Sequence, residues 1–263
     1  ALYSADIAFL CLPDAAARET AEAAPDADTV IIDTSTAHRT AQGWTYGMPE
    51  LAGMRGRIAQ SRRIANPGCH ASGFIALIAP LVGAGVISPD TPLSCFSLTG
   101  YSGGGKKMIA EYEESTDKLL SAPRLYALGE EHKHLPEMTK ISGITHPPLF
   151  VPVVSDYYAG MLTAVQLYAE GVNVQSIKDV YKDVYASGLI KYTEDGAEGG
   201  FMSGARMAGR DDMEISVHGN AERLLLTARF DNLGKGASGA AVQNMNIVLG
   251  IPEDTGLVTG DKK

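Results

Sequence analysis

The sequence predicts an α/β protein in which a parallel sheet comes first and an α+β part with a mainly antiparallel sheet follows. Two observations predict the parallel sheet. The apolar runs at 6–12 and 29–33 are typical of buried strands, and the Ala-rich stretch 14–24 between them favours a helix. The third observation concerns the second part, because strand-like runs outnumber helical ones beyond residue 149.

The first part should therefore run strand, helix, strand. Asp14, which follows Pro13, is placed to cap the N-terminus of the first helix. Residues 34–39 leave the C-terminal end of the second strand, where open α/β sheets bind their ligands. We expect residues 40–63 to be irregular and a short strand to follow at 64–65.

The second part mixes helices and strands. A helix over 70–82 should end at Gly83 and Gly85, and a helix over 107–121 should follow the glycine-rich loop 100–105. The remaining expected elements are strands at 93–99, 149–154, 161–169, 214–219 and 223–231, and helices at 173–187 and 239–249. The last helix has an apolar face that can pack back onto the first part.

Composition restricts the function. Of 263 residues 45% are apolar, and the net charge of -9 disfavours nonspecific binding to nucleic acid or anionic lipid. No apolar run reaches the ~20 residues of a membrane helix. Three widely spaced cysteines indicate a reduced, cytoplasmic protein, and Cys11 and Cys95 should be small buried side chains. An anionic substrate would require a local basic pocket.

Cys69 stands in a different context, at the end of the sequence Asn66-Pro-Gly-Cys. Proline and glycine enforce a tight turn, and a helical pattern begins immediately after the cysteine. A thiol at a helix N-terminus faces unpaired N–H groups and the positive end of the dipole, which favour the thiolate. A lone cysteine is more often a core residue, but this position favours a nucleophile for an activated acyl group.

A second candidate is the motif HKHLPE at 132–137. In an extended segment alternate side chains point to one side, so His132 and His134 could face one site. Histidine is the most frequent general base near neutral pH, although two solvated loop histidines fit the local sequence equally well. A zinc site formed with Cys69 lacks a recognised ligand spacing, and we expect no metal.

Two further segments could bind anions. The loop 100–105, followed by Lys106 and Lys107, offers backbone amides and cations to a phosphate or to the nicotinamide end of a cofactor. Glycine runs are more often plain turns. His38 and Arg39 follow a predicted strand, where a guanidinium could bind a phosphate or carboxylate; a surface arginine is the alternative.

Four motifs occur in a characteristic order and spacing: NPGC at 66–69, TGYSGGG at 99–105, HKHLPE at 132–137 and GASGAAVQNM at 236–245. In these the chain resembles N-acetyl-γ-glutamyl-phosphate reductases, members of the aspartate-semialdehyde dehydrogenase superfamily. The resemblance extends from Ala1 to about Val258 and is closest to the shorter form of the family.

The resemblance implies a truncated Rossmann-type NADP-binding domain over 1–68 and 239–263, and an α+β catalytic and oligomerisation domain over 69–238. It implies that NADPH reduces N-acetyl-γ-glutamyl phosphate to N-acetyl-glutamate 5-semialdehyde and phosphate, in arginine biosynthesis. The nucleophile would be Cys69, forming a thioester, with His132 as acid/base, although His132 and His134 could exchange roles.

The resemblance also supplies the other site residues. Substrate binding would involve Arg39, His134, Lys106 and Asn66. Binding of the cofactor NADP would involve Ser35, Ser102, Gly103 and Asn244. Relatives assemble through the second domain, which implies a homo-oligomer, a dimer or a tetramer.

Two features depart from the family pattern. His70 stands where many relatives carry tyrosine. The family's glycine-rich phosphate turn has no counterpart, so we expect about 50 residues, including the first βα unit, to be absent before Ala1. Two other functions stay open: an aspartate-semialdehyde dehydrogenase, which the HKHLPE motif disfavours, and a noncatalytic relative, which Cys69 and His132 disfavour.

Overall fold

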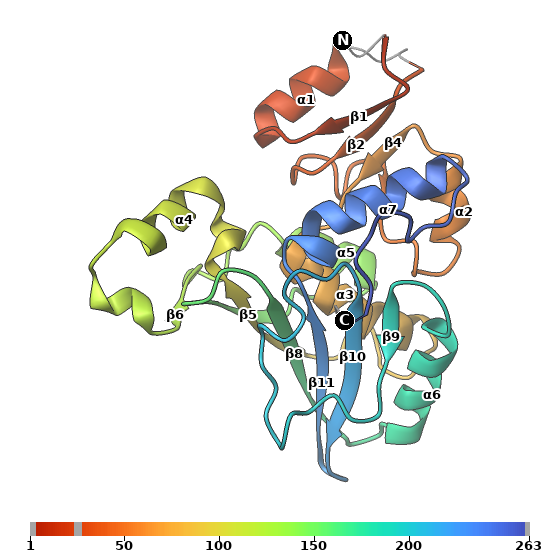
Figure 1. Ribbon diagram of the computed structural model, residues 1–263. Helices are drawn as coiled ribbons and strands as arrows, with labels where there is room; N and C mark the ends of the chain where they lie inside the picture. The colour runs from red at the N-terminus through yellow and green to blue at the C-terminus, as the bar shows by residue number, and fades with distance from the viewer. Residues whose placement is uncertain (1–3, 24–27, 261–263) are drawn as a thin grey trace.

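The first part of the molecule is a four-stranded parallel sheet, in the order β1-β2-β4-β3 (Figure 1). The computed structural model describes residues 4–23 and 28–260; Ala24, the last residue of the predicted first helix, lies outside them. The strands are β1 Ile7–Leu10, β2 Val30–Asp33, β3 Thr45–Tyr46 and β4 Arg63–Ala65. This parallel sheet confirms the prediction made from the apolar runs.

Three helices accompany this sheet, α1 Asp14–Glu22, α2 Met54–Ala59 and α7 Gly239–Val248. The helix α7 packs against α2 and β2, although it is nearly two hundred residues away from them in sequence. A small apolar core joins Ile32 and Ile64 of the strands to Ile58 of α2 and to Ala241 and Ile247 of α7. The expected return of the last helix onto the first part is therefore confirmed.

The second part is built on a seven-stranded mixed sheet, in the order β6-β7-β5-β8-β11-β10-β9. In the described chain four of its six strand pairings are antiparallel. The strands are β5 Ser94–Gly100, β6 Arg124–Leu125, β7 Leu149–Ser155, β8 Met161–Tyr168, β9 Ile190–Tyr192, β10 Met213–Gly219 and β11 Arg223–Phe230. The mainly antiparallel sheet that the sequence predicts is thus present.

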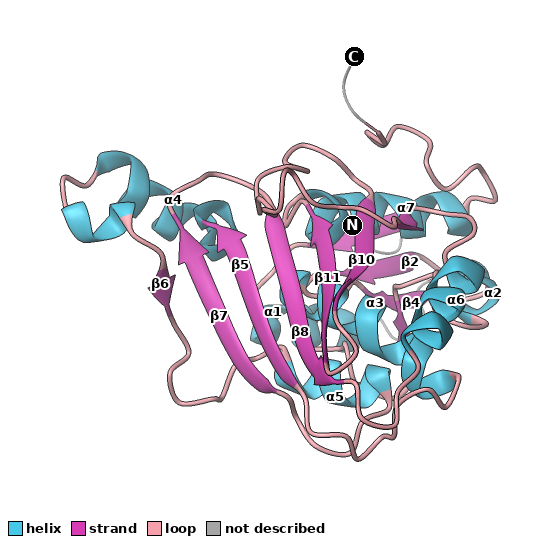
Figure 2. Cartoon of the chain, turned by 90° about the horizontal axis from the view of Figure 1, so that it is seen from below, coloured by secondary structure: helices cyan, strands magenta, loops and turns pink. Residues whose placement is uncertain are grey.

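The main core lies between this sheet and the helix α3 Cys69–Gly83, whose side chains from Ala71 to Ile78 are buried. The helix packs on β8 and β11 and is flanked by α5 Leu135–Ser142 and α6 Val174–Val184. Figure 2 looks onto the opposite face, where β5, β8 and β11 lie in front of the helices. Packing on the sheet fixes α3, and the first residue of α3 follows the short turn that leaves β4 of the parallel sheet.

Several local expectations are wrong. The region 40–63 is not wholly irregular, because it contains β3 and α2. Asp14 is the first residue of α1 rather than its cap, and its carboxylate accepts a hydrogen bond from the Thr36 backbone N–H at 2.9 Å. Cys95 is buried as expected, but Cys11 is exposed because it follows the end of β1.

The predicted helix over 107–121 is divided. Its first piece, α4 Gly105–Glu114, projects from the body (Figure 1), and the second is a 3₁₀ turn at Lys118–Ser121. The break has a local cause, since the Asp117 carboxylate accepts a hydrogen bond from Leu119 N at 2.9 Å and starts a new turn. No helix among the described residues is both long and apolar enough to cross a membrane.

Candidate active site

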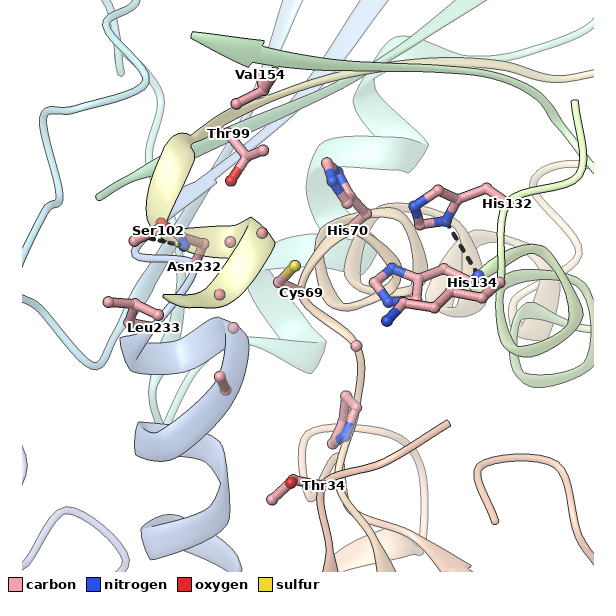
Figure 3. A pocket seen from close by; sticks show the side chains of 18 of the residues that line it. Thr34, Cys69, His70, Thr99, Ser102, His132, His134, Val154, Asn232 and Leu233 are labelled. Carbon is pink, nitrogen blue, oxygen red and sulfur yellow. Dashed lines mark hydrogen bonds between the residues drawn. The ribbon is translucent and has the colours of Figure 1, made fainter. Parts of the chain in front are cut away.

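A cavity of about 390 Å³ lies where the two parts of the molecule meet, and Figure 3 shows it. Most of its walls come from four places: the NPGC turn, the glycine-rich segment after β5, the turn before α5, and the chain between β11 and α7. Residues after β2, after β6 and in β7 also line it. Residues from distant points of the sequence therefore converge on one space, with Cys69 among them.

Cys69 is the first residue of α3, and Gly68 is its N-cap in an extended conformation. The neighbouring Asn66 donates from Nδ2 to the Ala237 carbonyl at 2.9 Å, which ties the turn to the segment before α7. Burial raises the pKa of the Cys69 thiol, while the charge of Arg39 and the His70 backbone N–H act to lower it. Burial outweighs the helix N-terminus, so the expected thiolate is wrong for the free protein.

Glu137 holds the NPGC turn in place. Its carboxylate is buried, forms an ion pair with Arg39 Nη1 at 2.7 Å, and accepts hydrogen bonds from Tyr46 OH at 2.8 Å and Gly68 N at 3.1 Å. A Cβ on Gly68 would lie 2.6 Å from both Glu137 Oε1 and His134 Nε2, so only glycine fits. One carboxylate thus joins α5, the first part and the nucleophile's turn.

The HKHLPE motif is not the extended segment that we predicted. His132 ends a loop, residues 133–134 form a turn, and α5 begins at Leu135. The two imidazoles nevertheless meet, with ring centroids 4.7 Å apart, because the backbone N–H of His134 donates to His132 Nδ1 at 3.2 Å (Figure 3). Turn geometry brings the rings together instead of strand alternation.

Both histidines are neutral at physiological pH. Burial lowers the pKa of His132 to about 4, and the nearby charges of Lys133 and Arg39 act in the same direction. Burial also lowers the pKa of His134, well below its usual range. The Nδ1 atom of His134 is buried without a hydrogen-bond partner, so it is available as a proton acceptor.

His70, directly after the nucleophile, uses both ring nitrogens. Nδ1 pairs with Ser97 Oγ at 2.7 Å and Nε2 with Tyr126 OH at 2.6 Å, while Ser97 Oγ lies 3.0 Å from Thr163 Oγ1. Burial lowers the pKa of His70 to about 3, so the ring carries a single proton. A neutral imidazole therefore links Tyr126, which lines the cavity, to the core of the sheet.

The glycine-rich segment forms the opposite wall. Ser102 is buried and accepts a hydrogen bond from Asn232 Nδ2 at 3.0 Å, while Asn232 Oδ1 accepts from Gly160 N at 2.8 Å. Ser102, Gly103 and Asn232 all line the cavity. Because Ser102 Oγ is already an acceptor, its own proton is free to donate to a ligand.

The predicted site residues separate into two groups. Seven line the cavity: Cys69, His132, Arg39, His134, Asn66, Ser102 and Gly103. Three predicted residues do not line the cavity. Lys106 is exposed at the start of α4, and Ser35 is buried against Asp33. Asn244 is buried, and its Nδ2 donates to Gly47 O at 2.9 Å. His38 also turns away, because it stacks on Trp44 and pairs with Asp33.

Sequence reasoning assigned no role to five residues that line or support the cavity: Tyr126, Lys133, Glu137, Asn232 and Thr99. Lys133 and Glu137 stood inside the quoted HKHLPE motif, so a signal existed for them. Thr99 likewise stood at the start of the quoted TGYSGGG motif, whereas Tyr126 and Asn232 carry no local pattern that separates them from ordinary loop or strand residues. Among the described residues, no group of three His, Cys, Asp or Glu side chains is arranged to hold a metal ion.

The chain matches two protein-family models. One is described as the semialdehyde dehydrogenase NAD binding domain, over residues 1–60, and the other as the semialdehyde dehydrogenase dimerisation domain, over residues 69–232. Aspartate semialdehyde dehydrogenase II of Vibrio cholerae has a TM-score of 0.73 at 20% identity, covering 95% of this chain and 81% of that chain. The NADP complex of the Candida albicans enzyme has a TM-score of 0.66 at 14% identity, covering 93% and 77%.

Fold and cavity thus define a semialdehyde-dehydrogenase type of oxidoreductase that uses a nicotinamide cofactor. N-acetyl-gamma-glutamyl-phosphate reductase 2 of Nostoc sp. is 40% identical, covering 97% of this chain and 85% of the relative. The reductase of Brucella anthropi is 42% identical, covering 95% and 84%. The chain belongs to the N-acetyl-γ-glutamyl-phosphate reductase family.

Proposed function

We propose that this chain catalyses the NADPH-dependent reduction of N-acetyl-γ-glutamyl phosphate to N-acetyl-glutamate 5-semialdehyde and phosphate, in arginine biosynthesis. One observation carries the proposal: the Cys69 thiol opens from a helix N-terminus into a cavity that two neutral imidazoles also line. This combination suits acyl transfer, since a thiol needs a nearby proton acceptor and an acyl group needs space beside the sulfur.

In the first half-reaction the thiol loses its proton and attacks the γ-carbonyl carbon. We assign proton acceptance to His134 Nδ1, which lacks a partner, because His132 Nδ1 already accepts from the His134 backbone. His132 then carries its proton on Nε2 and donates it toward the carbonyl oxygen as negative charge develops there. The S–C bond forms, the acyl C–O bond breaks, and phosphate leaves with the electron pair.

When bound, NADPH would supply the hydride that reduces the thioester carbon in the second half-reaction. The residues of this chain then hold the resulting thiohemiacetal on Cys69, and His132 Nε2–H stabilises its oxygen. Breakage of the S–C bond releases the aldehyde, and a proton from an imidazole returns to the sulfur. His134 is thus used first as a base and then as an acid in one turnover, while His132 donates its Nε2–H to the oxygen in both half-reactions.

The nicotinamide end of NADP fits the wall formed by the glycine-rich segment. Ser102 Oγ has a proton to donate, and the buried Oδ1 of Asn244 has no hydrogen-bond partner and can accept from an amide. We infer that Ser35, Ser102, Gly103 and Asn244 bind the cofactor. Arg39, Asn66 and His134 line the cavity on the substrate side.

We further infer that residues 1–68 and 239–263 form the NADP-binding domain, and that residues 69–238 form a catalytic domain that also assembles the homo-oligomer. The face of the seven-stranded sheet opposite α3 supports the second inference (Figure 2). Large apolar side chains stand exposed at the ends of two of its strands, Leu149 of β7 at 68% and Tyr168 of β8 at 80%. Pairing of two copies as a dimer or within a tetramer would remove this surface from water.

The test is oxidation of N-acetyl-glutamate 5-semialdehyde, measured with NADP and phosphate. It should be run on this chain and on a form extended to the length of its relatives, each with the substitution Cys69→Ser. Activity should fall about 10³-fold or more in the serine variant, because serine is a far weaker nucleophile at this pH. Cys11→Ser is the matched control. Activity that survives in Cys69→Ser, or that prefers aspartate semialdehyde, would overturn the proposal.

A further inference from the structure

We propose that Lys133 binds the phosphoryl group of the substrate. The inference rests on the proposed function and deepens it, because it names the side chain that recognises the leaving group. The sequence suggested Lys106 for a substrate anion, but Lys106 is exposed and lies outside the cavity lining. Lys133, between the two histidines of HKHLPE, is part of that lining.

Lys133 brings to the cavity a positive charge that forms no ion pair, although it acts at longer range on the Asp14 carboxylate and lowers the pKa of that group. Among the described residues that line it, the permanent cations are Arg39 and Lys133. Arg39 is largely committed: its guanidinium pairs with Glu137 at 2.7 Å and donates to the carbonyls of Asn66 at 3.0 Å and Thr34 at 3.1 Å. No salt bridge in the described part of the chain involves Lys133.

The histidines do not change this balance, because all three that line the cavity are neutral at physiological pH. Overall the protein carries a net charge of -9, so its long-range field repels an acyl phosphate. A dianionic phosphoryl group must therefore be held by a local cation, and a lysine ammonium is a common partner for phosphate.

The position of Lys133 selects the phosphoryl group over the substrate's carboxylate. Lys133 lines the same cavity as Cys69, whose sulfur the reacting carbonyl must reach, and its charge acts on that sulfur less strongly than the charge of Arg39 does. In an acyl phosphate a single oxygen joins phosphorus to that carbonyl, whereas the α-carboxylate lies further along the carbon chain. As the acyl C–O bond breaks, phosphate takes the electron pair, and Lys133 stabilises the charge that develops.

Alkylation of Cys69 tests this role without turnover. Iodoacetamide modifies the free thiol, inorganic phosphate should slow the modification, and mass spectrometry of the Cys69 peptide separates it from exposed Cys11. Each variant is compared by the phosphate concentration that gives half-protection, because the loss of Lys133 also changes the intrinsic reactivity of the thiol. Lys133→Met should raise this concentration about tenfold or more, the usual effect of losing a charged hydrogen bond.

Two matched variants complete the experiment. Lys106→Met removes an exposed lysine on the neighbouring wall and should protect like the wild type. Lys133→Arg retains the charge and should restore most of the protection. The unfolding temperature of every variant should equal that of the wild type, since both lysines are exposed.

The inference is overturned if Lys133→Met is half-protected at the wild-type phosphate concentration. It is also overturned if the variant keeps phosphate protection but loses protection by N-acetyl-glutamate, because Lys133 would then bind a carboxylate. Failure of the proposed function has a different signature, since no form of the chain would oxidise N-acetyl-glutamate 5-semialdehyde. Protection by phosphate is read independently of that outcome.

Discussion

The substitution Glu137→Gln tests whether one carboxylate holds the site together. Glu137 is 1% exposed and accepts from Arg39, Tyr46 and the backbone of Gly68. Glutamine has nearly the same shape but carries no charge, and one of its terminal groups donates instead of accepting. If the amide nitrogen replaces Oε1, Arg39 loses its acceptor, and if it replaces Oε2, both Tyr46 OH and Gly68 N lose theirs. In either orientation Arg39 loses its counter-ion.

The cost can be worked out from these contacts. Breaking one side of a buried ion pair costs about 3–5 kcal/mol, and the lower figure applies because Arg39 keeps its bonds to Thr34 O and Asn66 O. A loss of about 3 kcal/mol corresponds to roughly 6–12 °C in unfolding temperature for a chain of this size. The charge of Glu137 also raises the pKa of Cys69, so its removal should lower that pKa and speed alkylation at fixed pH.

Loosening of the fold would also speed alkylation of a buried thiol, so the rate is followed against pH. Loss of the Glu137 charge should move the titration of Cys69 to lower pH, whereas loosening should speed alkylation without moving it. Differential scanning fluorimetry gives the unfolding temperature, and iodoacetamide modification of the Cys69 peptide at each pH gives the reactivity. Glu114→Gln, at the exposed end of α4, is the control and should change neither. An unfolding temperature within about 2 °C of the wild type, or slower alkylation, would refute the reasoning.

Two further predictions concern the same turn. Gly68→Ala should reduce activity at least about 100-fold and destabilise the protein by several kcal/mol, because the new methyl group overlaps three side chains. The control is Gly56→Ala in α2, where open space surrounds the glycine. Denaturant titrations should show a free energy of unfolding that is unchanged or higher by up to about 1 kcal/mol. Equal changes for Gly68→Ala and Gly56→Ala would contradict the prediction. In a pH series, Cys69 alkylation should rise about tenfold per unit from pH 7 to 9, because burial raises the thiol pKa. A plateau in the alkylation rate below about pH 8 would contradict the raised pKa of the Cys69 thiol. An inflection caused by His132 well above its pKa of about 4 would contradict the neutral state assigned to that imidazole.

Elements with strong periodicity were predictable from the sequence. The strands from β1 to β11 that carry continuous or alternating apolar residues match their expected ranges closely, as does α3. Among the short elements, the strand predicted at 64–65 is present as β4 Arg63–Ala65. The short elements β3 and α2 were not predicted, since they gain their stability from tertiary contacts, for example Ile58 packed against α7. Two-residue and six-residue segments carry too few positions for a pattern to appear.

The sequence was sufficient to predict which motifs contribute to the cavity, but not how their residues are arranged in space. Cys69 and the two histidines are local signals, and they do meet. The sequence could not show that the Gly68 amide is held by a carboxylate 69 positions away, or that Asn232 supports Ser102. Such pairs are joined only through the register of strands and the packing of helices.

The charge balance at Cys69 also says when the thiol becomes reactive. In the free protein burial holds the thiol protonated and the imidazoles neutral. A dianionic substrate beside Lys133 raises the pKa of both the thiol and the imidazoles, since negative charge favours their protonated forms. The proton acceptor therefore becomes a stronger base when an acyl group is present to consume the thiolate. Because the pKa of the thiol rises with that of the imidazoles, the charge of the substrate does not by itself move the proton; attack on the acyl group consumes the thiolate and draws the transfer forward. In the unoccupied enzyme the thiol stays protonated and therefore reacts slowly with alkylating agents and oxidants.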